Sequence, residues 1–315
     1  VVAILMVLLW IPAIWGSQNV NVYYKLDESL PKYLPSILAN EEVEKNYDMN
    51  SVSMILVHKD LSSKDTKALL SEIKNVEGIA FALGSDSLMG PMLPSSIVPE
   101  ELSEKFSSDT WKMLLLSSEY AVASDEVNAQ CEQLQQIIKS YDPEGMLVGE
   151  APATKDLVRI TTRDFKVVSL ISIGAIFILI FLVLKSRSLP FILVLVIELA
   201  INLNMGISYF TGATLPFIAS VCIGTIQLGA TVDYAILMTN RYIKERKDGA
   251  GKKEAVQTAL STSLNAVFTS AMGFFASTVG VALYSDADLI ASLCLLLARG
   301  AIISMVIVLT ILPAM

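Results

Sequence analysis

Residues 223–238 read Ile223-Gly-Thr-Ile-Gln-Leu-Gly-Ala-Thr-Val-Asp-Tyr-Ala-Ile-Leu-Met238, an apolar run that contains one acidic residue, Asp233. On membrane-insertion scales a carboxylate at the centre of a spanning helix costs about 3 kcal/mol, so such a residue normally lines a cavity, has a partner or binds a proton. The run therefore predicts a membrane-spanning helix, and it makes Asp233 a candidate functional residue.

The composition places the chain among membrane proteins and separates one polar part from the rest. The chain has 315 residues, a mean hydropathy of +0.58 and 17% charged residues, which is too apolar for an ordinary soluble domain. Residues 17–166 hold 14 Lys and Arg against 24 Asp and Glu, whereas the remainder holds 9 against 7. The acidity belongs to one soluble segment. Its negative charge excludes nucleic acid as a partner, because nucleic-acid binding needs a basic face.

Six apolar stretches predict membrane-spanning helices. They cover residues 1–15 (a truncated span), 167–184, 189–210, 215–239, 258–283 and 288–313. Basic residues concentrate at 185–187 and 241–253, whereas the connections at 208–215 and 284–288 carry none. The positive-inside rule then predicts a multi-pass plasma-membrane protein whose large polar segment is extracytoplasmic.

The predicted organisation has three parts. A truncated first transmembrane helix covers 1–16, an extracytoplasmic domain covers 17–164, and a five-helix bundle covers 165–315 with a cytoplasmic basic linker at 241–254. The chain begins without an initiator Met or a basic flank and stops inside an apolar run, which predicts a piece of a longer polypeptide. The basic linker has two interpretations: a determinant of topology, or a site for anionic lipid or a partner.

The polar segment contains two successive β-α-β patterns. Strands are expected at 51–57, 78–83, 111–117 and 146–148, with helices at 62–76 and 124–141, and a Pro-rich passage (Pro91, Pro94, Pro99) divides the two patterns. A further helix is expected at 36–47, and residues 151–164 are expected to run continuously into the second span. This order predicts a ferredoxin-like α+β domain.

Neither cysteine chemistry nor a metal site is predicted. Two of the three cysteines lie inside apolar runs and Cys131 stands alone in the polar segment, so no disulfide framework is expected. The single histidine, His58, has no second His or Cys at ligand spacing, which predicts an ordinary surface histidine. Residues 224–229 have P-loop spacing, but no Lys-Ser/Thr follows them, so nucleotide binding is excluded and no cofactor is expected.

Two neighbours of Asp233 make it a candidate proton site. Gly229 lies one helical turn away and leaves room for another helix or for water beside the carboxylate. Tyr234 follows directly, and its phenol can donate to an ionised carboxylate. The alternatives are that Asp233 forms a structural ion pair and that Tyr234 is a packing residue.

Further polar residues lie within the predicted spans. Glu198, with Asn202 one turn on, and Arg299 are near mid-span. With Asp233 they make two acids and one cation, which favours a protonatable acid or a partner outside the chain, although Glu198 and Arg299 also suit a purely structural role. The fifth helix carries a small and polar stripe that consists of Ser261, Asn265, Thr269, Gly273 and Ser277. Such a stripe indicates either a close helix-helix contact or a hydrated proton path.

Two motifs carry a family resemblance. The segment Gly229-Ala-Thr-Val-Asp-Tyr-Ala-Ile-Leu-Met-Thr-Asn-Arg-Tyr242 and the ending Ala298-Arg-Gly-Ala-Ile-Ile-Ser-Met305 through Ile311-Leu-Pro313 resemble one repeat of a resistance-nodulation-division (RND) transporter, above all of its MMPL-type branch. The resemblance implies two similar halves, a porter-type domain after the first span of each, and proton-coupled export by Asp-Tyr pairs, a role that falls here on Asp233 and Tyr234. The segment 21–27 and the run 223–238 resemble the second repeat more than the first.

The leading hypothesis is half of a proton-driven exporter of hydrophobic or amphiphilic molecules such as lipids and drugs. Its expected partners are membrane lipids, the cargo, the other six-helix repeat and possible further copies of the protein. Gly229, Glu198, Asn265, Thr269 and Arg299 are the supporting polar residues. The alternative is a lipid- or sterol-sensing protein that recruits a partner through its ectodomain. An enzyme is not expected, because an intramembrane aspartyl protease needs two membrane aspartates.

Overall fold

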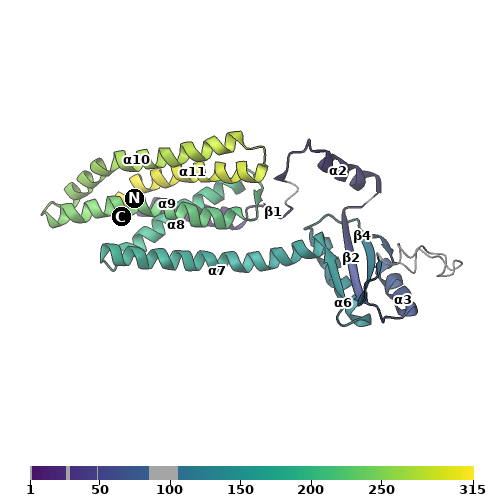
Figure 1. The fold of residues 1–315 in the computed structure, drawn as a ribbon. Helices are drawn as coiled ribbons and strands as arrows, with labels where there is room; N and C mark the ends of the chain where they lie inside the picture. The colour runs from purple at the N-terminus through teal and green to yellow at the C-terminus, as the bar shows by residue number, and fades with distance from the viewer. Residues whose placement is uncertain (1, 26–28, 48, 85–105) are drawn as a thin grey trace. The chain divides into compact units, whose positions relative to one another are not determined.

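The computed structural model describes residues 2–25, 29–47, 49–84 and 106–315 (Figure 1). The chain divides into two compact units. The helical unit comprises Val1–Tyr23, Ser29–Pro31 and Thr162–Met315, and the α/β unit comprises Tyr24–Glu28 and Lys32–Thr161. The predicted Pro-rich passage at Pro91, Pro94 and Pro99 lies outside the described residues.

The helical unit is built from long apolar helices. They are α1 (Val2–Gln18), α7 (Glu150–Leu184), α8 (Leu189–Phe210), α9 (Ala219–Lys247), α10 (Lys252–Tyr284) and α11 (Asp288–Thr310), followed by the 3-10 turn η3 (Leu312–Ala314). Helix α7 belongs to this unit from Thr162 on, and its earlier residues belong to the α/β unit. Within the described residues, the five helices α7 to α11 are long and apolar enough to cross a membrane. The 17-residue α1 is apolar too and packs along α8.

Close helix packing in this unit depends on small residues. A Cβ added to Gly206 of α8 would lie 3.0 Å from the carbonyl oxygen of Ala13 in α1, so the two backbones approach where no side chain intervenes. Helix α10 buries a stripe of mostly small residues against α9 and α11. The stripe consists of Ala255, Ala259, Ser263, Val267 and Ala271. This buried stripe lies on a different side of α10 from the predicted small and polar stripe that begins at Ser261.

The predicted limits of the fourth and fifth spans differ from the structure. The fourth span was expected from residue 215, but Leu215–Pro216 form strand β6, which pairs in parallel with β1 (Val22–Tyr23). The amide of Leu215 donates to Asn21 and that of Phe217 to Tyr23, so these backbone groups are used before α9 begins.

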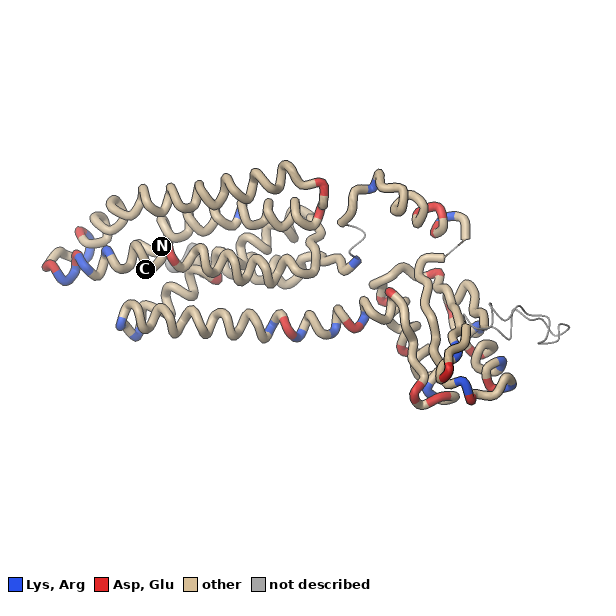
Figure 2. Tube along the Cα trace, viewed as in Figure 1, with Lys and Arg blue, Asp and Glu red and all other residues tan. Residues whose placement is uncertain are grey.

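The basic linker expected at 241–254 is mostly helical. Residues 241–247 form the last turns of α9, and Lys252 already begins α10. Hydropathy predicts only the part of a helix that lies in the hydrocarbon of the membrane. Lys, Arg and Glu are good helix formers, so the helix can continue beyond that part. Figure 2 shows Lys and Arg gathered at this end of the helical unit, at the α7–α8 and α9–α10 turns.

The α/β unit contains both predicted β-α-β patterns. The first is β2 (Ser51–His58), α3 (Ser63–Lys74) and β3 (Ile79–Leu83), and the second is β4 (Trp111–Ser118), α6 (Asp125–Tyr141) and β5 (Met146–Gly149). Helix α2 (Pro35–Tyr47) precedes them. The sheet has the strand order β3-β4-β2-β5, and every neighbouring pair is antiparallel. The expected elements are therefore confirmed to within a few residues.

Local chemistry and one shared core explain this arrangement. The side chains of Ser62 and Ser124 cap α3 and α6 by accepting from the amides of Asp65 and Val127, each at 3.1 Å. Both helices pack on the face of β2 that buries alternate residues. The fully buried core residues of this face include Ile55, Leu69, Ile73, Leu114, Leu134 and Ile138.

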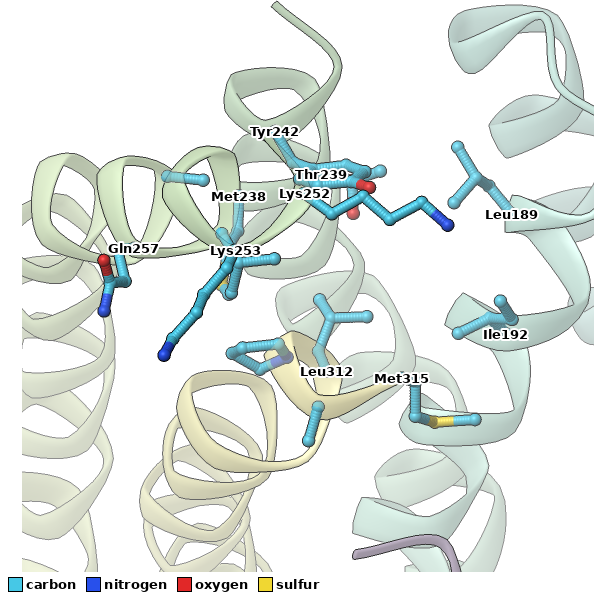
Figure 3. A pocket seen from close by; sticks show the side chains of 14 residues that line it. Leu189, Ile192, Met238, Thr239, Tyr242, Lys252, Lys253, Gln257, Leu312 and Met315 are labelled. Carbon is cyan, nitrogen blue, oxygen red and sulfur yellow. The ribbon is translucent and has the colours of Figure 1, made fainter. Parts of the chain in front are cut away.

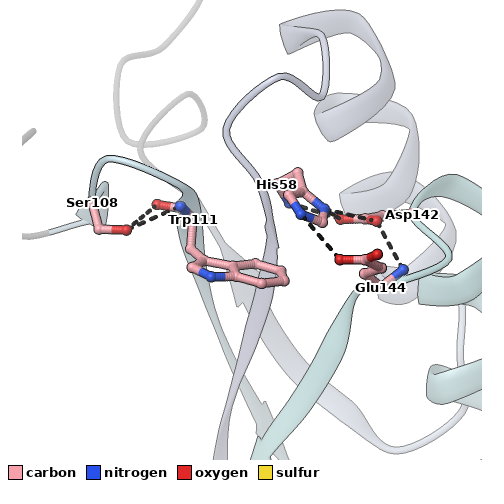
Figure 4. A network of polar contacts seen from close by, with 5 residues as sticks. All are labelled: His58, Ser108, Trp111, Asp142 and Glu144. Atoms are coloured by element: carbon pink, nitrogen blue, oxygen red, sulfur yellow. Dashed lines mark hydrogen bonds and ion pairs between the residues drawn. The ribbon is translucent and has the colours of Figure 1, made fainter.

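His58 has a structural role, contrary to the plain surface position predicted for it (Figure 4). Its backbone amide donates to the Asp142 carboxylate at 2.7 Å, its ring Nδ1 lies 3.0 Å from the same oxygen, and the ring stacks on Trp111 at 4.3 Å. The amide of Glu144 donates to the other Asp142 oxygen at 3.0 Å. Burial opposes ionisation of Asp142, but these hydrogen bonds from His58 and Glu144 outweigh it and lower the pKa of the carboxyl. The cluster ties the end of β2 to the α6–β5 turn.

Candidate functional site

Helix α9 presents two chemically different faces. Its buried face includes Gln227, Thr231 and Tyr234, while Asp233 lies on the exposed face. Gly229 is on the open side as predicted, because a Cβ added there would have no neighbouring heavy atom within 4 Å. The helical period places adjacent residues about 100° apart, so Asp233 and Tyr234 turn to different sides.

The Asp233 carboxylate has no partner within the described part of the chain. Neither a hydrogen bond nor an ion pair to a described residue involves it. The structural ion pair considered as an alternative is therefore not formed among these residues. An exposed carboxylate on a helix of spanning length must meet water, a proton or a group from outside the chain.

Tyr234 is buried in the core of the helical unit. It is 4% exposed and packs in a cluster with Leu193, Ile197 and Val267. The same cluster includes Ala271 of α10. Tyr234 thus has the packing role considered for it, and it packs with residues of α8 and α10 rather than with Asp233.

A buried polar network joins the inner face of α9 to α8 and α11. The Asn204 side-chain amide donates to the Gln227 side-chain carbonyl at 2.8 Å and to the backbone carbonyl of Leu296 at 3.0 Å. Gln227 in turn donates to the Ser304 hydroxyl at 3.0 Å. The Thr231 hydroxyl lies 2.7 Å from the same hydroxyl and 2.6 Å from the Gln227 carbonyl. Asn204, Gln227, Thr231 and Ser304 are all at most 2% exposed.

Arg299 extends this network at its α8 side. Its Nε donates to the Asn204 side-chain oxygen at 2.8 Å, and one terminal nitrogen donates to the Asn204 carbonyl at 2.6 Å and to the Ser208 hydroxyl at 2.7 Å. The cation is therefore held by neutral oxygens. Three hydrogen bonds thus hold the guanidinium without a carboxylate, which favours the structural role considered for Arg299.

The network needs a glycine at residue 300. A Cβ there would lie 2.7 Å from both the Asn204 nitrogen and the Gln227 oxygen. Because those two atoms hydrogen-bond each other, any side chain at this position would push the bonded amides apart. Gly300 therefore lets three helices meet around one set of hydrogen bonds.

Comparison with known proteins identifies the family of this arrangement. The model of the MMPL family matches residues 39–315. The chain belongs to the MMPL family. This finding, together with the apolar helices, makes it a multi-pass membrane protein.

Two relatives of this MMPL-family chain are described as membrane proteins. "Putative membrane protein YdgH" of Bacillus subtilis (strain 168) is 23% identical over 257 residues, which are 75% of this chain and 28% of the relative. "Putative membrane protein MJ1562" of Methanocaldococcus jannaschii is 24% identical over 341 residues, which are 95% of this chain and 85% of the relative. The chain thus spans little more than a quarter of the first relative and most of the second.

The remaining predicted site residues of this MMPL-family chain lie apart from the network. Glu198 is half-buried, and its carboxylate makes no hydrogen bond or ion pair with the described residues. Asn202 donates to the backbone carbonyl of Glu198 at 2.8 Å and accepts from Ser17 of α1 at 2.7 Å. Asn265 and Thr269 are exposed on α10, as is the rest of their stripe. The stripe is therefore available to a partner or to water.

Sequence reasoning missed most of the buried network. Asn204 and Gln227 carry a detectable signal, because each is an amide inside an apolar run of spanning length, as Asp233 is an acid inside one. Gln227 and Thr231 also lie one turn apart on the same face. Ser208 and Ser304 carry no such signal, since the spans contain many serines that bond only to their own helix.

Proposed function

We propose that this chain is one half of a proton-driven exporter of hydrophobic or amphiphilic molecules, in which Asp233 takes up and releases the proton. The single observation that carries the proposal is the exposed, unpartnered Asp233 carboxylate on a helix of spanning length. Membership of the MMPL family and the RND resemblance support the transport class. In the proposed assembly six spans, counting α1, face a second six-helix repeat across the open side of α9.

The buried face of α9 suggests how the proton would move the helix. When Asp233 is ionised its face needs water or a polar partner, and when it is protonated the face tolerates an apolar one. The membrane potential supplies about 2.3 kcal/mol per charge per 100 mV to drive this change. The hydrogen bonds of Gln227 and Thr231 tie α9 to α11 and α8, and the cluster that Tyr234 shares with Val267 ties it to α10. A shift of α9 would therefore carry its neighbours with it.

The α/β unit is assigned the role of a porter-type domain outside the cytoplasm. Its β-α-β-β-α-β order and the strand order β3-β4-β2-β5 agree with a ferredoxin-like fold. The basic turns of the helical unit, at Lys185 to Arg187 and around Lys252, support the plasma-membrane orientation. We assign no enzymatic reaction to either unit.

Transport by the full-length protein tests the proposal. The protein is reconstituted in vesicles with an imposed proton gradient, and both internal pH and movement of a fluorescent amphiphile are followed. Asp233→Asn should reduce gradient-driven transport at least 100-fold, because a neutral amide cannot carry a proton. The matched control is Asp288→Asn, which changes an exposed aspartate in the first turn of α11.

Three outcomes distinguish the roles. Loss in Asp233→Asn with normal transport in Asp288→Asn supports the proposal. Unimpaired transport in Asp233→Asn removes Asp233 from the mechanism. Tyr234→Phe should lower transport less than Asp233→Asn does, because it keeps the buried ring in its cluster and leaves the Asp233 carboxyl in place.

A further inference from the structure

A cavity of about 550 Å³ lies within the helical unit at the end that carries the basic turns (Figure 3). It is bounded by the first turns of α8 and α10, by the last turns of α9 and by η3 with Met315. None of the residues that form the polar network or the open face with Asp233 lines it. The cavity is therefore separate from the candidate proton site.

The cavity has an apolar wall and a cationic rim. Leu189, Ile192, Met238 and Leu312 contribute apolar side chains from different elements. Lys252 and Lys253 line it from the first turn of α10, and Figure 3 shows Lys252 extending across it toward Leu189. Such a combination suits a ligand with a charged head and an apolar body.

The two lysines are free to bind an external anion. Neither makes an ion pair with an acidic residue in the part of the chain that the structure describes. Glu254, the nearest acid in sequence, is not among the residues that line the cavity. The hydroxyl-bearing Thr239 and Tyr242 add hydrogen-bonding groups to the same lining.

We propose that this cavity binds one anionic phospholipid of the leaflet that faces the basic turns. Lys252, which extends across the cavity, binds its phosphate, and Lys253 on the other side of the rim adds positive charge. The apolar wall of Ile192, Met238 and Leu312 holds the start of its acyl chains. Charge complementarity selects the occupant, because lysines at a membrane surface attract anionic lipid whereas apolar walls alone do not distinguish headgroups. The inference does not rest on proton-driven transport.

A second cavity of the helical unit shows what the lysines add. It measures about 490 Å³, lies between α1, α8 and α11, and is lined by aliphatic side chains and Thr310 without a Lys or Arg. Such a surface accepts an alkyl chain whatever its headgroup is. Of these two cavities, only the one lined by Lys252 and Lys253 is therefore expected to select a lipid by its headgroup.

Lipid retention by the purified full-length protein tests the proposal. Micelles are doped with either phosphatidylglycerol or phosphatidylcholine of the same acyl chains, and bound lipid is counted by native mass spectrometry. The wild type should retain phosphatidylglycerol at least tenfold better. The double variant Lys252→Gln, Lys253→Gln should bind it about 30-fold more weakly, because each lysine near a membrane surface contributes about 1 kcal/mol, or about fivefold, to anionic-lipid binding.

Two controls separate a site from general surface charge. Lys244→Gln with Lys247→Gln removes two exposed charges at the end of α9 that do not line the cavity, and it should leave retention unchanged. Ile192→Trp should weaken phosphatidylglycerol binding by filling the cavity without altering its charge. Equal retention of the two lipids by the wild type, or equal losses in the two lysine double variants, would overturn the proposal. Transport by the same lysine variants is scored separately, so failure here leaves the test of Asp233 intact.

Discussion

Two aspartates, one in each unit, have opposite environments. Asp142 of the α/β unit has a side chain that is 7% exposed, yet its oxygens accept from the amides of His58 and Glu144. Asp233 of the helical unit is exposed and has no hydrogen-bond or ion-pair partner among the described residues. A carboxylate whose bonds are all made within the chain stabilises the fold, whereas one left open inside an apolar helix is a candidate for function.

The same contrast exists between the two faces of α9. On the inner face Gln227 and Thr231 have all their contacts within the helical unit. On the outer face Gly229 and Asp233 have space beside them. The inner face therefore determines how α9 is held, and the outer face is available for whatever moves it.

The strongest way to break the inner face is Gly300→Val. Its side chain would displace the amides of Asn204 and Gln227 and leave buried polar groups unpaired, so we expect a loss of about 3 kcal/mol in the free energy of unfolding. The measurement is a denaturant titration of the full-length protein in micelles. Gly229→Ala is the matched control on the outer face, and it should be neutral or slightly stabilising because Ala favours a helix. Equal losses in both variants would contradict the distinction between the two faces.

The second test removes the partnered carboxylate. Asp142→Ala leaves the amides of His58 and Glu144 without their acceptor, so local stability of the α/β unit should fall by about 2 kcal/mol. Hydrogen exchange of the β2 and β5 amides in the full-length protein measures this loss. Unchanged exchange would show that the cluster in Figure 4 does not hold the β2 end.

The pH dependence of that loss follows from the direction of the pKa shift. Because the folded state holds the pKa of Asp142 below its ordinary value of 3.8, the stabilisation is complete above that value and is lost as the pH falls through the lower, folded pKa. The difference between wild type and Asp142→Ala should thus be no smaller at about pH 5 than at about pH 7. A difference that already shrinks at about pH 5 would contradict the lowered pKa.

A milder test of the inner face is Gln227→Leu. This substitution keeps the volume but removes the hydrogen bonds to Asn204 and Ser304. Hydrogen bonds between membrane helices contribute modestly, so we expect a loss of about 1 kcal/mol in unfolding free energy. Gln257→Leu on the exposed side of α10 is the control for replacing a glutamine, and no loss is expected there.

The smallest effect on stability is expected for Asp233→Asn. The carboxylate makes no bond within the described chain, so the unfolding free energy of the full-length protein should change by less than about 0.5 kcal/mol. The same variant is expected to lose transport, which separates function from folding at this residue. A stability loss as large as that of Gln227→Leu would show that a group outside this chain already binds Asp233.

Hydropathy and local signals were sufficient for most of the architecture. The spans at 189–210 and 288–313 and the two β-α-β patterns agree with the structure because burial in lipid and alternation in strands leave direct periodic marks. The limits of α9 and α10 were missed because both helices extend beyond their apolar runs through segments rich in Lys, Arg and Glu. Hydropathy does not mark the end of a helix in such a segment. The strand pair of Leu215 with Val22 joins distant segments and is invisible to local patterns.

The candidate site residues differ in the same way: those with a local sequence signal were predicted, and those that depend on distant partners were missed. Asp233 was found from sequence because the cost of a charge in hydrocarbon depends on the residue and its apolar neighbours alone. The role of His58 was missed because its partner, Asp142, is 84 residues away in sequence. The network around Gly300 was missed for the same reason, since it brings together three helices.

The sequence by itself determined that this chain crosses a membrane several times, that residues 51–83 and 111–148 each form a β-α-β pattern, and that Asp233 needs an explanation. Only the tertiary structure decided that Tyr234 turns inward, that Asn204, Gln227, Thr231 and Ser304 share one buried network, and that Asp233 faces outward. The physical reason is that transfer into lipid is a property of a segment. Hydrogen-bond satisfaction depends instead on which helices pack together and on how each is rotated about its axis.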